Sequence, residues 1–400
     1  MKAVYLDNNA TTRVDPDVVQ TMLPFFTEQF GNPSSAHAFG ESVGAALKTA
    51  RKQLQELLGA AHDYEIVYTS GGTESNNTAI LSALEALPDR SEIVTSKVEH
   101  PAVLTLCEHL EKIGRAKVHY IGVDSFGRLD IDAYRAALSD KVALVSLMWA
   151  NNETGTIFPV EGLAELAKEH GALFHTDAVQ AVGKAPISLK DSVIDMLSLS
   201  GHKLHAPKGI GALYVKRGAR FKPLLRGGHQ ERGRRGGTEN VPAIVGLGKA
   251  AQLALQHMAD EQGRVREMRD RLEKAVLQRI PNCFVNGDPH DRLPNTANIA
   301  FEYVESEAIL LHLNRGGVAA SSGSACASGS MEPSHVLKAM EIPASALHGA
   351  VRFSFSRDNV AEDVDRVVEA LPGILEKLRE LSPFWADADK KSNDSKPVYA

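Results

Sequence analysis

The chain has 400 residues, 43% of them hydrophobic, and its 44 Lys and Arg against 50 Asp and Glu give a formal net charge of -6. This is the composition of a globular protein with two or three domains, and its acidic balance excludes a general attraction to nucleic acid or to an anionic membrane. Because there is no long apolar run, no apolar signal-peptide core and no CxxC pair among three cysteines, we expect a cytoplasmic protein with no membrane partner and no disulfide framework.

The first part of the chain predicts an arm followed by a large α/β domain. Residues 1–15 are expected to form the arm, because Asp7-Asn8-Asn9 favours turns over helix. Helical spacing of apolar residues runs from Gly40 to Leu58, where Gly59 is placed to end the helix. Strands are predicted at 65–69, 92–95, 117–123, 142–149, 172–176, 196–199 and 212–215, with intervening helices that include 73–87, 102–113 and 161–170. This alternation predicts a mainly parallel seven-stranded sheet in a large domain spanning 16–255.

The second part of the chain predicts a smaller α/β domain, 256–385, which the arm joins. A long helical stretch at 241–279, expected to be interrupted, leads into it. Strands are predicted at 296–301 and 351–355, and helices at 306–314, 334–340 and 361–381. The small polar residues of 319–332 predict a mobile loop, and the polar tail at 386–400 is expected to be disordered.

Lys203 is the first candidate for chemistry. The apolar run from Met196 to Leu199 predicts a buried strand, so Ser200-Gly201-His202-Lys203 begins at its carboxyl end, where open α/β sheets bind ligands. A partly desolvated lysine near other positive groups has a lowered pKa and can attack a carbonyl cofactor. The alternative is an ordinary surface lysine, so the neighbouring motifs must decide.

Three further motifs follow strands of the same sheet. Ser70-Gly71-Gly72-Thr73 opens a helix, and its free backbone amides either hold a phosphate or form a tight turn. Asp177, with Gln180 about one helical turn later, either keeps a pyridine nitrogen protonated or caps a helix. His100 either stacks on a planar ring and shuttles protons or packs beside its proline turn.

Three polar segments leave two interpretations each. Asn152 could bond a ring hydroxyl or a substrate carboxylate, or belong to a simple turn. The basic, glycine-rich segment 226–238 is either a solvated loop or an anion site. Arg352 lies on a strand between buried neighbours and needs an anionic partner, which either the protein or a substrate supplies.

Cysteine placement singles out Cys326. Cys107 and Cys283 lie among apolar residues, as packed cysteines do. Cys326 lies in the segment expected to be exposed and mobile, which makes it a candidate nucleophile, with an unreactive loop cysteine as the alternative.

In their order and spacing these residues resemble the cysteine desulfurases, fold-type I pyridoxal-phosphate enzymes of the class-V aminotransferase family and of the NifS/IscS type. The resemblance is closest to the nitrogen-fixation (NifS) branch and runs from Tyr5 to about Pro383. Its most specific segments are MWANNETGT from 148, HTDAVQAVGK from 175, SGHKLHAPKG from 200, GGHQERGRRGGTEN from 227 and SSGSACASGS from 321. The last of these resembles the long-loop class of the family.

The resemblance implies a pyridoxal 5'-phosphate cofactor and a role for each residue. The implied catalytic residues are Lys203, which binds the cofactor covalently, His100, which lies over its ring, and Cys326, which takes the sulfur. The implied cofactor-binding residues are Gly72, Thr73, Asn152, Asp177 at the pyridine nitrogen, Gln180 at the ring hydroxyl, Ser200, His202, Lys203 and, across a homodimer interface, Thr238. The implied substrate-binding residues are Arg352, Asn32 and Asn152.

The implied reaction removes sulfur from L-cysteine to give L-alanine and a persulfide on Cys326. An iron-sulfur scaffold protein would accept the sulfur, with nitrogenase as the expected client. No intrinsic metal site is implied, although Cys326 is a candidate transient ligand of the cluster. Alternatives are a housekeeping or tRNA-thiolation desulfurase, a selenocysteine lyase or an aminotransferase on the same fold. From a different class, a non-catalytic sulfur carrier or scaffold partner is the alternative.

Overall fold

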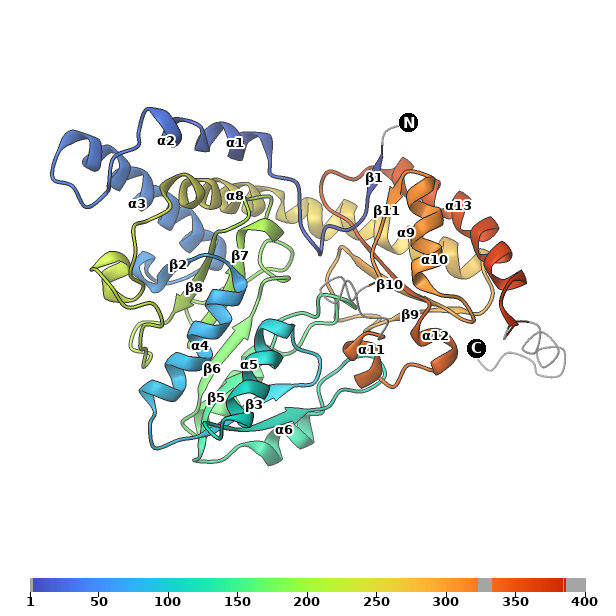
Figure 1. Ribbon diagram of the computed structural model, residues 1–400, viewed down its shortest axis with the longest axis horizontal. Helices are drawn as coiled ribbons and strands as arrows, with labels where there is room; N and C mark the ends of the chain where they lie inside the picture. Colours follow the sequence, from blue (N-terminus) through green and yellow to red (C-terminus); the bar gives the residue numbers. More distant parts are fainter. Residues whose placement is uncertain (1–2, 323–332, 384, 386–400) are drawn as a thin grey trace.

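The computed structural model describes residues 3–322, 333–383 and 385. One half of the molecule contains a seven-stranded sheet and the other a three-stranded sheet. A long helical segment, α8 (Val241–Asp260) continuing into α9 (Arg266–Arg279), runs between them (Figure 1). Within the described residues, no helix combines the length and the apolar character needed to span a bilayer.

The large sheet has the strand order β2-β8-β7-β6-β5-β3-β4. Its strands are β2 (Ile66–Thr69), β3 (Glu92–Ser96), β4 (Lys117–Ile121), β5 (Val142–Ser146), β6 (Leu173–Asp177), β7 (Met196–Ser200) and β8 (Gly211–Val215). Strand β8 is antiparallel to both neighbours, whereas the other pairs are parallel. The predicted mainly parallel sheet is confirmed, and its central strands are continuous apolar runs because helices cover both faces.

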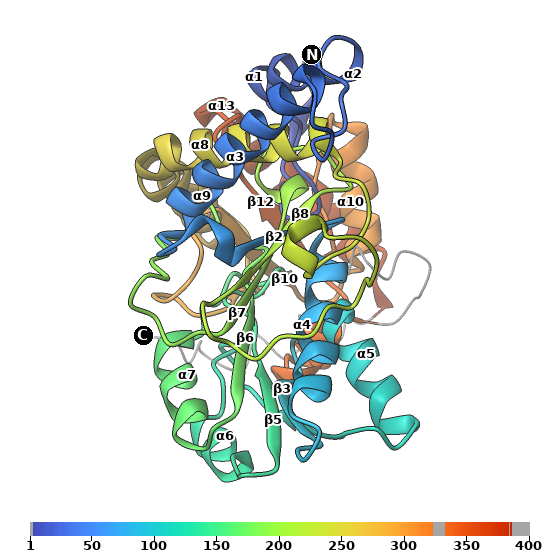
Figure 2. The same cartoon turned by 90° about the vertical axis from the view of Figure 1, so that its left-hand side faces the viewer.

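Helices on the two faces belong to separate apolar clusters. On one face lie α1 (Pro16–Met22), α2 (Pro24–Thr27), α3 (Ala38–Leu58), α6 (Ile131–Ala137), α7 (Val160–Glu169) and α8 (Val241–Asp260). On the other lie α4 (Gly72–Ala86) and α5 (Pro101–Lys112), as Figure 2 shows from the side. Because side chains alternate along a strand, Ile66 and Tyr68 enter the first cluster and Val67 the second.

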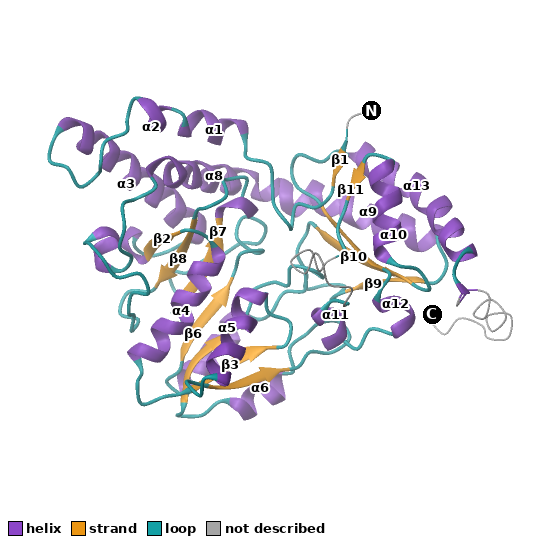
Figure 3. Ribbon diagram, viewed as in Figure 1, coloured by secondary structure: helices purple, strands orange, loops and turns teal. Residues whose placement is uncertain are grey.

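The small sheet is antiparallel, in the order β12-β10-β9, with β9 (Cys283–Asn286), β10 (Thr296–Phe301) and β12 (Ala350–Ser354). Its helices are α9 (Arg266–Arg279), α10 (Ser306–Arg315), α11 (His335–Ala339), α12 (Ala344–Leu347) and α13 (Ala361–Glu380) (Figure 3). The amino-terminal β1 (Val4–Tyr5) pairs with β11 (Val318–Ala319), and Val4 and Leu6 enter the core of this half. The exact domain boundaries stay predictions.

The structure differs from the sequence prediction mainly at short elements. The predicted helix over 241–279 is indeed interrupted, because a π-helical segment, Glu261–Val265, joins α8 to α9. Strands β1, β9 and β11 and helices α1, α2, α6 and α12 were not predicted. They are two to seven residues long. Such short elements show little periodicity of their own and depend on the segments they pair with.

Candidate active site

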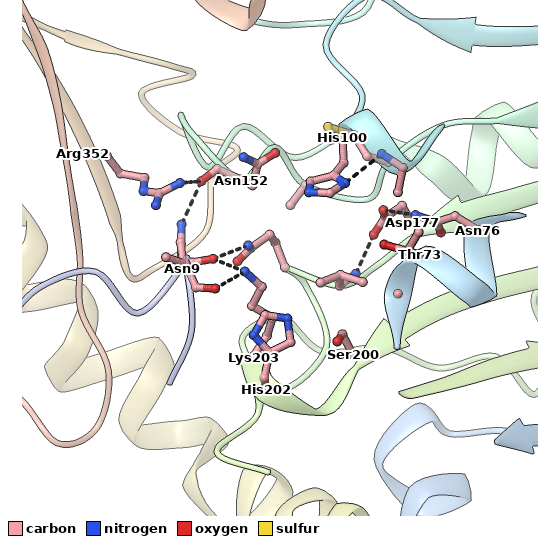
Figure 4. A pocket seen from close by; sticks show the side chains of 17 residues that line it. Asn9, Thr73, Asn76, His100, Asn152, Asp177, Ser200, His202, Lys203 and Arg352 are labelled. Atoms are coloured by element: carbon pink, nitrogen blue, oxygen red, sulfur yellow. Dashed lines mark hydrogen bonds between the residues drawn. The ribbon is translucent and has the colours of Figure 1, made fainter. Parts of the chain in front are cut away.

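A cavity of about 260 Å³ lies beyond the carboxyl ends of β6 and β7 (Figure 4). The arm, α4, the loops that follow β3, β5, β6 and β7, and strand β12 all contribute to its lining. The predicted residues that line it are Gly72, Thr73, His100, Asn152, Asp177, Gln180, Ser200, His202, Lys203 and Arg352. The structure therefore brings together side chains from segments as far apart as α4 and β12.

Lys203 ends a short 3-10 turn, Gly201–Lys203, directly after β7. Its Nζ donates hydrogen bonds to the carbonyl oxygens of Ala10, at 2.7 Å, and Asn9. A side chain at Gly201 would bring Cβ to 2.9 Å from Ile210 Cγ2, so the close turn at this position requires glycine. The arm thus holds the lysine ammonium group inside the cavity.

His202 lies beside this lysine and is neutral at physiological pH. Burial, followed by the charge of Lys203, lowers the pKa of His202 to about 4. Its Nδ1 is 3.2 Å from Thr11 Oγ1. A neutral imidazole keeps one N–H donor, which suits contact with an anion without adding charge.

Asp177 is a buried carboxylate held by two donors. Its Oδ2 accepts a hydrogen bond from Asn76 Nδ2 at 2.6 Å, and its Oδ1 accepts one from the Val179 amide at 3.0 Å. Asn76, on α4, was not predicted. The signal that could have found it is its position three residues after Thr73, on the same helix face. The two bonds fix the carboxylate at the cavity wall.

The amino terminus of α4 forms an anion cradle. Its N-cap residue is Gly71, which supplies no side-chain cap, so the first amides of the helix are left for a ligand. A Cβ at Gly72 would lie 3.0 Å from Val179 Cγ2 and 3.7 Å from Ser200 Cβ. Glycine keeps this cradle open, and Thr73 and Ser200 line it with hydroxyl groups.

His100 lines the cavity and also caps α5, and its role over a planar ring stays a prediction. Its Nδ1 accepts a hydrogen bond from the Ala102 amide at 3.1 Å.

The preceding Glu99 is fully buried, and burial raises the pKa of its carboxyl group to about 8. Glu99 Oε1 accepts hydrogen bonds from Ser96 Oγ, at 2.7 Å, and from the Met148 amide, at 3.0 Å.

Arg352 is 2% exposed and pairs with a protein carboxylate. Its Nη2 lies 2.9 Å from Asp7 Oδ1, and its Nη1 donates to the Asn152 carbonyl oxygen at 2.9 Å. Its backbone pairs with Ser321, where the Arg352 amide donates to the Ser321 carbonyl at 2.7 Å. These contacts fix the guanidinium at the cavity edge.

Two predicted residues lie away from the cavity lining. Asn32 is exposed in a turn, where its Oδ1 accepts a hydrogen bond from the Ser34 amide at 2.9 Å. Thr238 is exposed in the loop that precedes α8. Their roles stay predictions.

Cys326, most of the 319–332 loop and the 386–400 tail lie outside the described residues. On one side of that gap, Ser321 pairs with Arg352. On the other, Ser334 Oγ donates to Glu153 Oε2 at 2.6 Å, and His335 Nε2 lies 2.9 Å from the Glu99 carbonyl oxygen. Both flanks of the gap are therefore fixed close to residues of the cavity edge.

The other two cysteines are poor nucleophiles. Burial raises the pKa of Cys107 to about 12 and that of Cys283 to about 11. Among residues 3–322, 333–383 and 385, no group of three or more His, Cys, Asp or Glu side chains could hold a metal ion.

The lining fits a phosphorylated pyridine aldehyde. Lys203 supplies an amine, Asp177 a carboxylate for the ring nitrogen and His100 an aromatic ring. The amino terminus of α4 supplies a cradle for the phosphate, because its N-cap residue, Gly71, has no side chain to bond the first backbone amides of the helix. Arg352 adds a cation for a carboxylate at the opposite edge from α4, as Figure 4 shows.

Comparison with known proteins agrees with this geometry. The aminotransferase class-V family matches residues 4–367. A cysteine desulfurase of Gluconacetobacter diazotrophicus is 70% identical over 400 residues, and the cysteine desulfurase NifS of Azotobacter vinelandii is 62% identical over 402 residues, with 100% of both chains covered in each case. A solved structure described as a NifS-like protein has a TM-score of 0.87 at 35% identity, covering 94% of this chain and 100% of that chain.

Proposed function

Since the chain belongs to the class-V aminotransferase family and is a pyridoxal-phosphate-dependent cysteine desulfurase, we propose that the cavity beyond β6 and β7 is its active site. Its substrate is L-cysteine, and iron-sulfur cluster assembly is the general role of such enzymes. The predictions of family, fold class, activity and cofactor are confirmed. Relatives at 70%, 62%, 59% and 58% identity are described as cysteine desulfurases, which disfavours the aminotransferase, selenocysteine lyase and non-catalytic alternatives.

The single observation that supports this site best is the placement of Lys203 and Asp177 at the ends of neighbouring parallel strands, in one cavity. When bound, pyridoxal phosphate supplies an electron sink for the substrate Cα. Lys203 would hold the cofactor covalently, and its amine would take up the proton from the substrate Cα. Asp177, held by Asn76 and the Val179 amide, keeps the ring nitrogen protonated.

The phosphate would lie at the amino terminus of α4, with donors from Gly72, Thr73, Ser200 and His202. The neutral state of His202 supports this assignment, because its remaining N–H donates without raising the positive charge around Lys203. His100 would lie over the ring. Its Nδ1 accepts a hydrogen bond from the Ala102 amide, which fixes the orientation of the imidazole ring.

The substrate carboxylate would bind Arg352, with Asn152 and Asn32. Contacts to Asp7 and to the Asn152 carbonyl support Arg352, because they fix its guanidinium at the cavity edge. Holding the substrate carboxylate in this way orients the Cα–H bond for removal of its proton by Lys203.

Cys326 would receive the sulfur. Its thiolate attacks the substrate sulfur, an S–S bond forms as the C–S bond breaks, and the bond electrons return to the carbon skeleton, which takes up protons to become L-alanine. The fixed flanks of its segment, at Ser321 and Ser334, support this assignment because both lie beside the cavity edge. An iron-sulfur scaffold protein of the cytoplasm then accepts the sulfur, with nitrogenase as the client.

A homodimer would complete the site, with Thr238 of each subunit reaching the phosphate in its partner. An exposed apolar group around α2 and the start of α3 supports this proposal, since Phe26, Phe30 and Phe39 are 56–66% exposed. Analytical ultracentrifugation tests the dimer directly.

The decisive experiment pairs two variants of the holoenzyme. Cys326→Ser should keep the visible absorbance of bound pyridoxal phosphate and lose alanine formation from cysteine. Lys203→Ala should lose the covalent cofactor signal. Full alanine formation by Cys326→Ser would refute the assignment of Cys326, and an unchanged cofactor spectrum in Lys203→Ala would refute that of Lys203.

A further inference from the structure

A second lysine, Lys184, lies buried beneath the active-site cavity and has no part in the reaction described above. It is 6% exposed, in the loop between β6 and β7. Its Nζ donates hydrogen bonds to Gln180 Oε1, at 2.9 Å, and to Asn9 Oδ1, at 3.5 Å. Both acceptors are neutral amide oxygens, and a buried amino group held in this way needs a reason to be there.

Lys184 contacts the side-chain amide of Gln180, and two hydrogen bonds determine which way this amide is turned. Its Oε1 accepts from Lys184 Nζ, while its Nε2 donates to the Asn9 carbonyl oxygen at 3.0 Å. A flipped amide would set its oxygen against the Asn9 carbonyl oxygen, and would turn its NH2 group instead of its oxygen toward the Lys184 amino group. Both contacts therefore exclude the flipped amide.

One hydrogen of the Gln180 amide remains for the cavity. Nε2 has two N–H bonds, and the bond to Asn9 uses one of them. Gln180 lines the active-site cavity, whereas Lys184 does not. The orientation that Lys184 and the Asn9 carbonyl fix together thus makes Gln180 a donor, and not an acceptor, toward whatever lies in the cavity.

Lys184 and Lys203 also share a second, small cavity of about 20 Å³ behind the active site. The titratable or charged residues that line it are Lys184, Lys203, His205, His257, Glu261 and Arg357. Burial and the charge of Lys203 lower the pKa of Lys184, whereas the carboxylate of Glu261 opposes this shift and Arg352 adds to it. Glu261 lies in the π-helical segment, and burial raises the pKa of its carboxyl group.

We propose that Lys184 is a positioning residue that fixes the Gln180 amide with its NH2 group toward the cofactor, so that Gln180 donates a hydrogen bond to the ring oxygen of bound pyridoxal phosphate. This inference rests on the proposed active site and adds to it a residue that touches neither cofactor nor substrate. A donated hydrogen bond favours the ionised ring oxygen over its protonated form. Lys184 thereby sets the pH at which the bound cofactor titrates.

The test is a pH titration of the visible absorbance of the holoenzyme. Lys184→Met keeps the length of the side chain and removes its donor, and its titration midpoint should rise by about one pH unit, a ten-fold change in the acid constant. Lys184→Arg restores a donor to Gln180 Oε1 and should return the midpoint toward that of the unmodified enzyme. Lys216→Met is the matched control, because Lys216 is a half-buried lysine that bonds the Ser192 carbonyl and does not line the cavity.

A double-variant cycle separates action through Gln180 from a direct charge effect. In a Gln180→Leu background, Lys184→Met should shift the midpoint no further. An additive shift, or a midpoint in Lys184→Met equal to that of the unmodified enzyme, would overturn the proposal. If Lys184→Met does not fold, Lys184→Leu, which also lacks a donor, is titrated against the same two outcomes. If the unmodified enzyme forms no alanine from cysteine, the proposed function itself is refuted.

Discussion

Glu99 makes the stability of this protein depend on pH in a predictable direction. The carboxyl group is fully buried next to His100, and burial raises its pKa from 4.5 to about 8. Between these two values the folded chain keeps a proton that the unfolded chain has released. Stability therefore falls as pH rises through this window. At about pH 8 and above, the ionised carboxylate costs up to about 5 kcal/mol of the free energy of unfolding.

Glu99→Gln removes this titration and preserves the shape of the side chain. The amide oxygen still accepts from Ser96 Oγ and from the Met148 amide. We expect wild type and variant to be similar in stability near pH 5, and the variant to be more stable by several kcal/mol near pH 9.

Urea unfolding of both proteins at pH 5, 7 and 9, followed by tryptophan fluorescence, measures this difference. Glu108→Gln is the matched control, because Glu108 is exposed on α5 in the same region, and its difference from wild type should not change with pH. A constant difference between Glu99→Gln and wild type across the three pH values would refute the reasoning.

Three further predictions concern the site and the interface. Arg352→Lys should raise the KM for cysteine about ten-fold or more with an unchanged cofactor spectrum, because a lysine cannot form two parallel bonds to the substrate carboxylate. Initial rates of alanine formation measure the KM, and an unchanged KM contradicts the prediction. Gly72→Ala should weaken binding of pyridoxal phosphate more than that of unphosphorylated pyridoxal in equilibrium dialysis, because its Cβ would enter the phosphate cradle, 3.0 Å from Val179 Cγ2. Phe30→Asp, on the exposed aromatic group, should shift the sedimentation of the protein toward monomer, whereas Phe126→Asp, at another exposed phenylalanine, should not.

The sequence by itself determined the α/β class and most of the long elements. Strands that are buried on both faces read as continuous apolar runs, so β2 to β8 were predicted to within a few residues. Because parallel strands end at the same edge of a sheet, Asp177 and Lys203 were also predicted to share a site. These inferences need only local pattern and one rule of topology.

Only the tertiary structure decided which side chains meet. Arg352 pairs with Asp7, 345 residues earlier, and Asp177 pairs with Asn76, 101 residues earlier, and no local periodicity encodes such contacts. Asn9 joins Lys203, Gln180 and Lys184 because the arm pairs with β11 and passes beneath the cavity. Hydrogen-bond directions and buried pKa values depend on this three-dimensional proximity, which is why the sequence named Lys203 and the fold was needed to find Lys184.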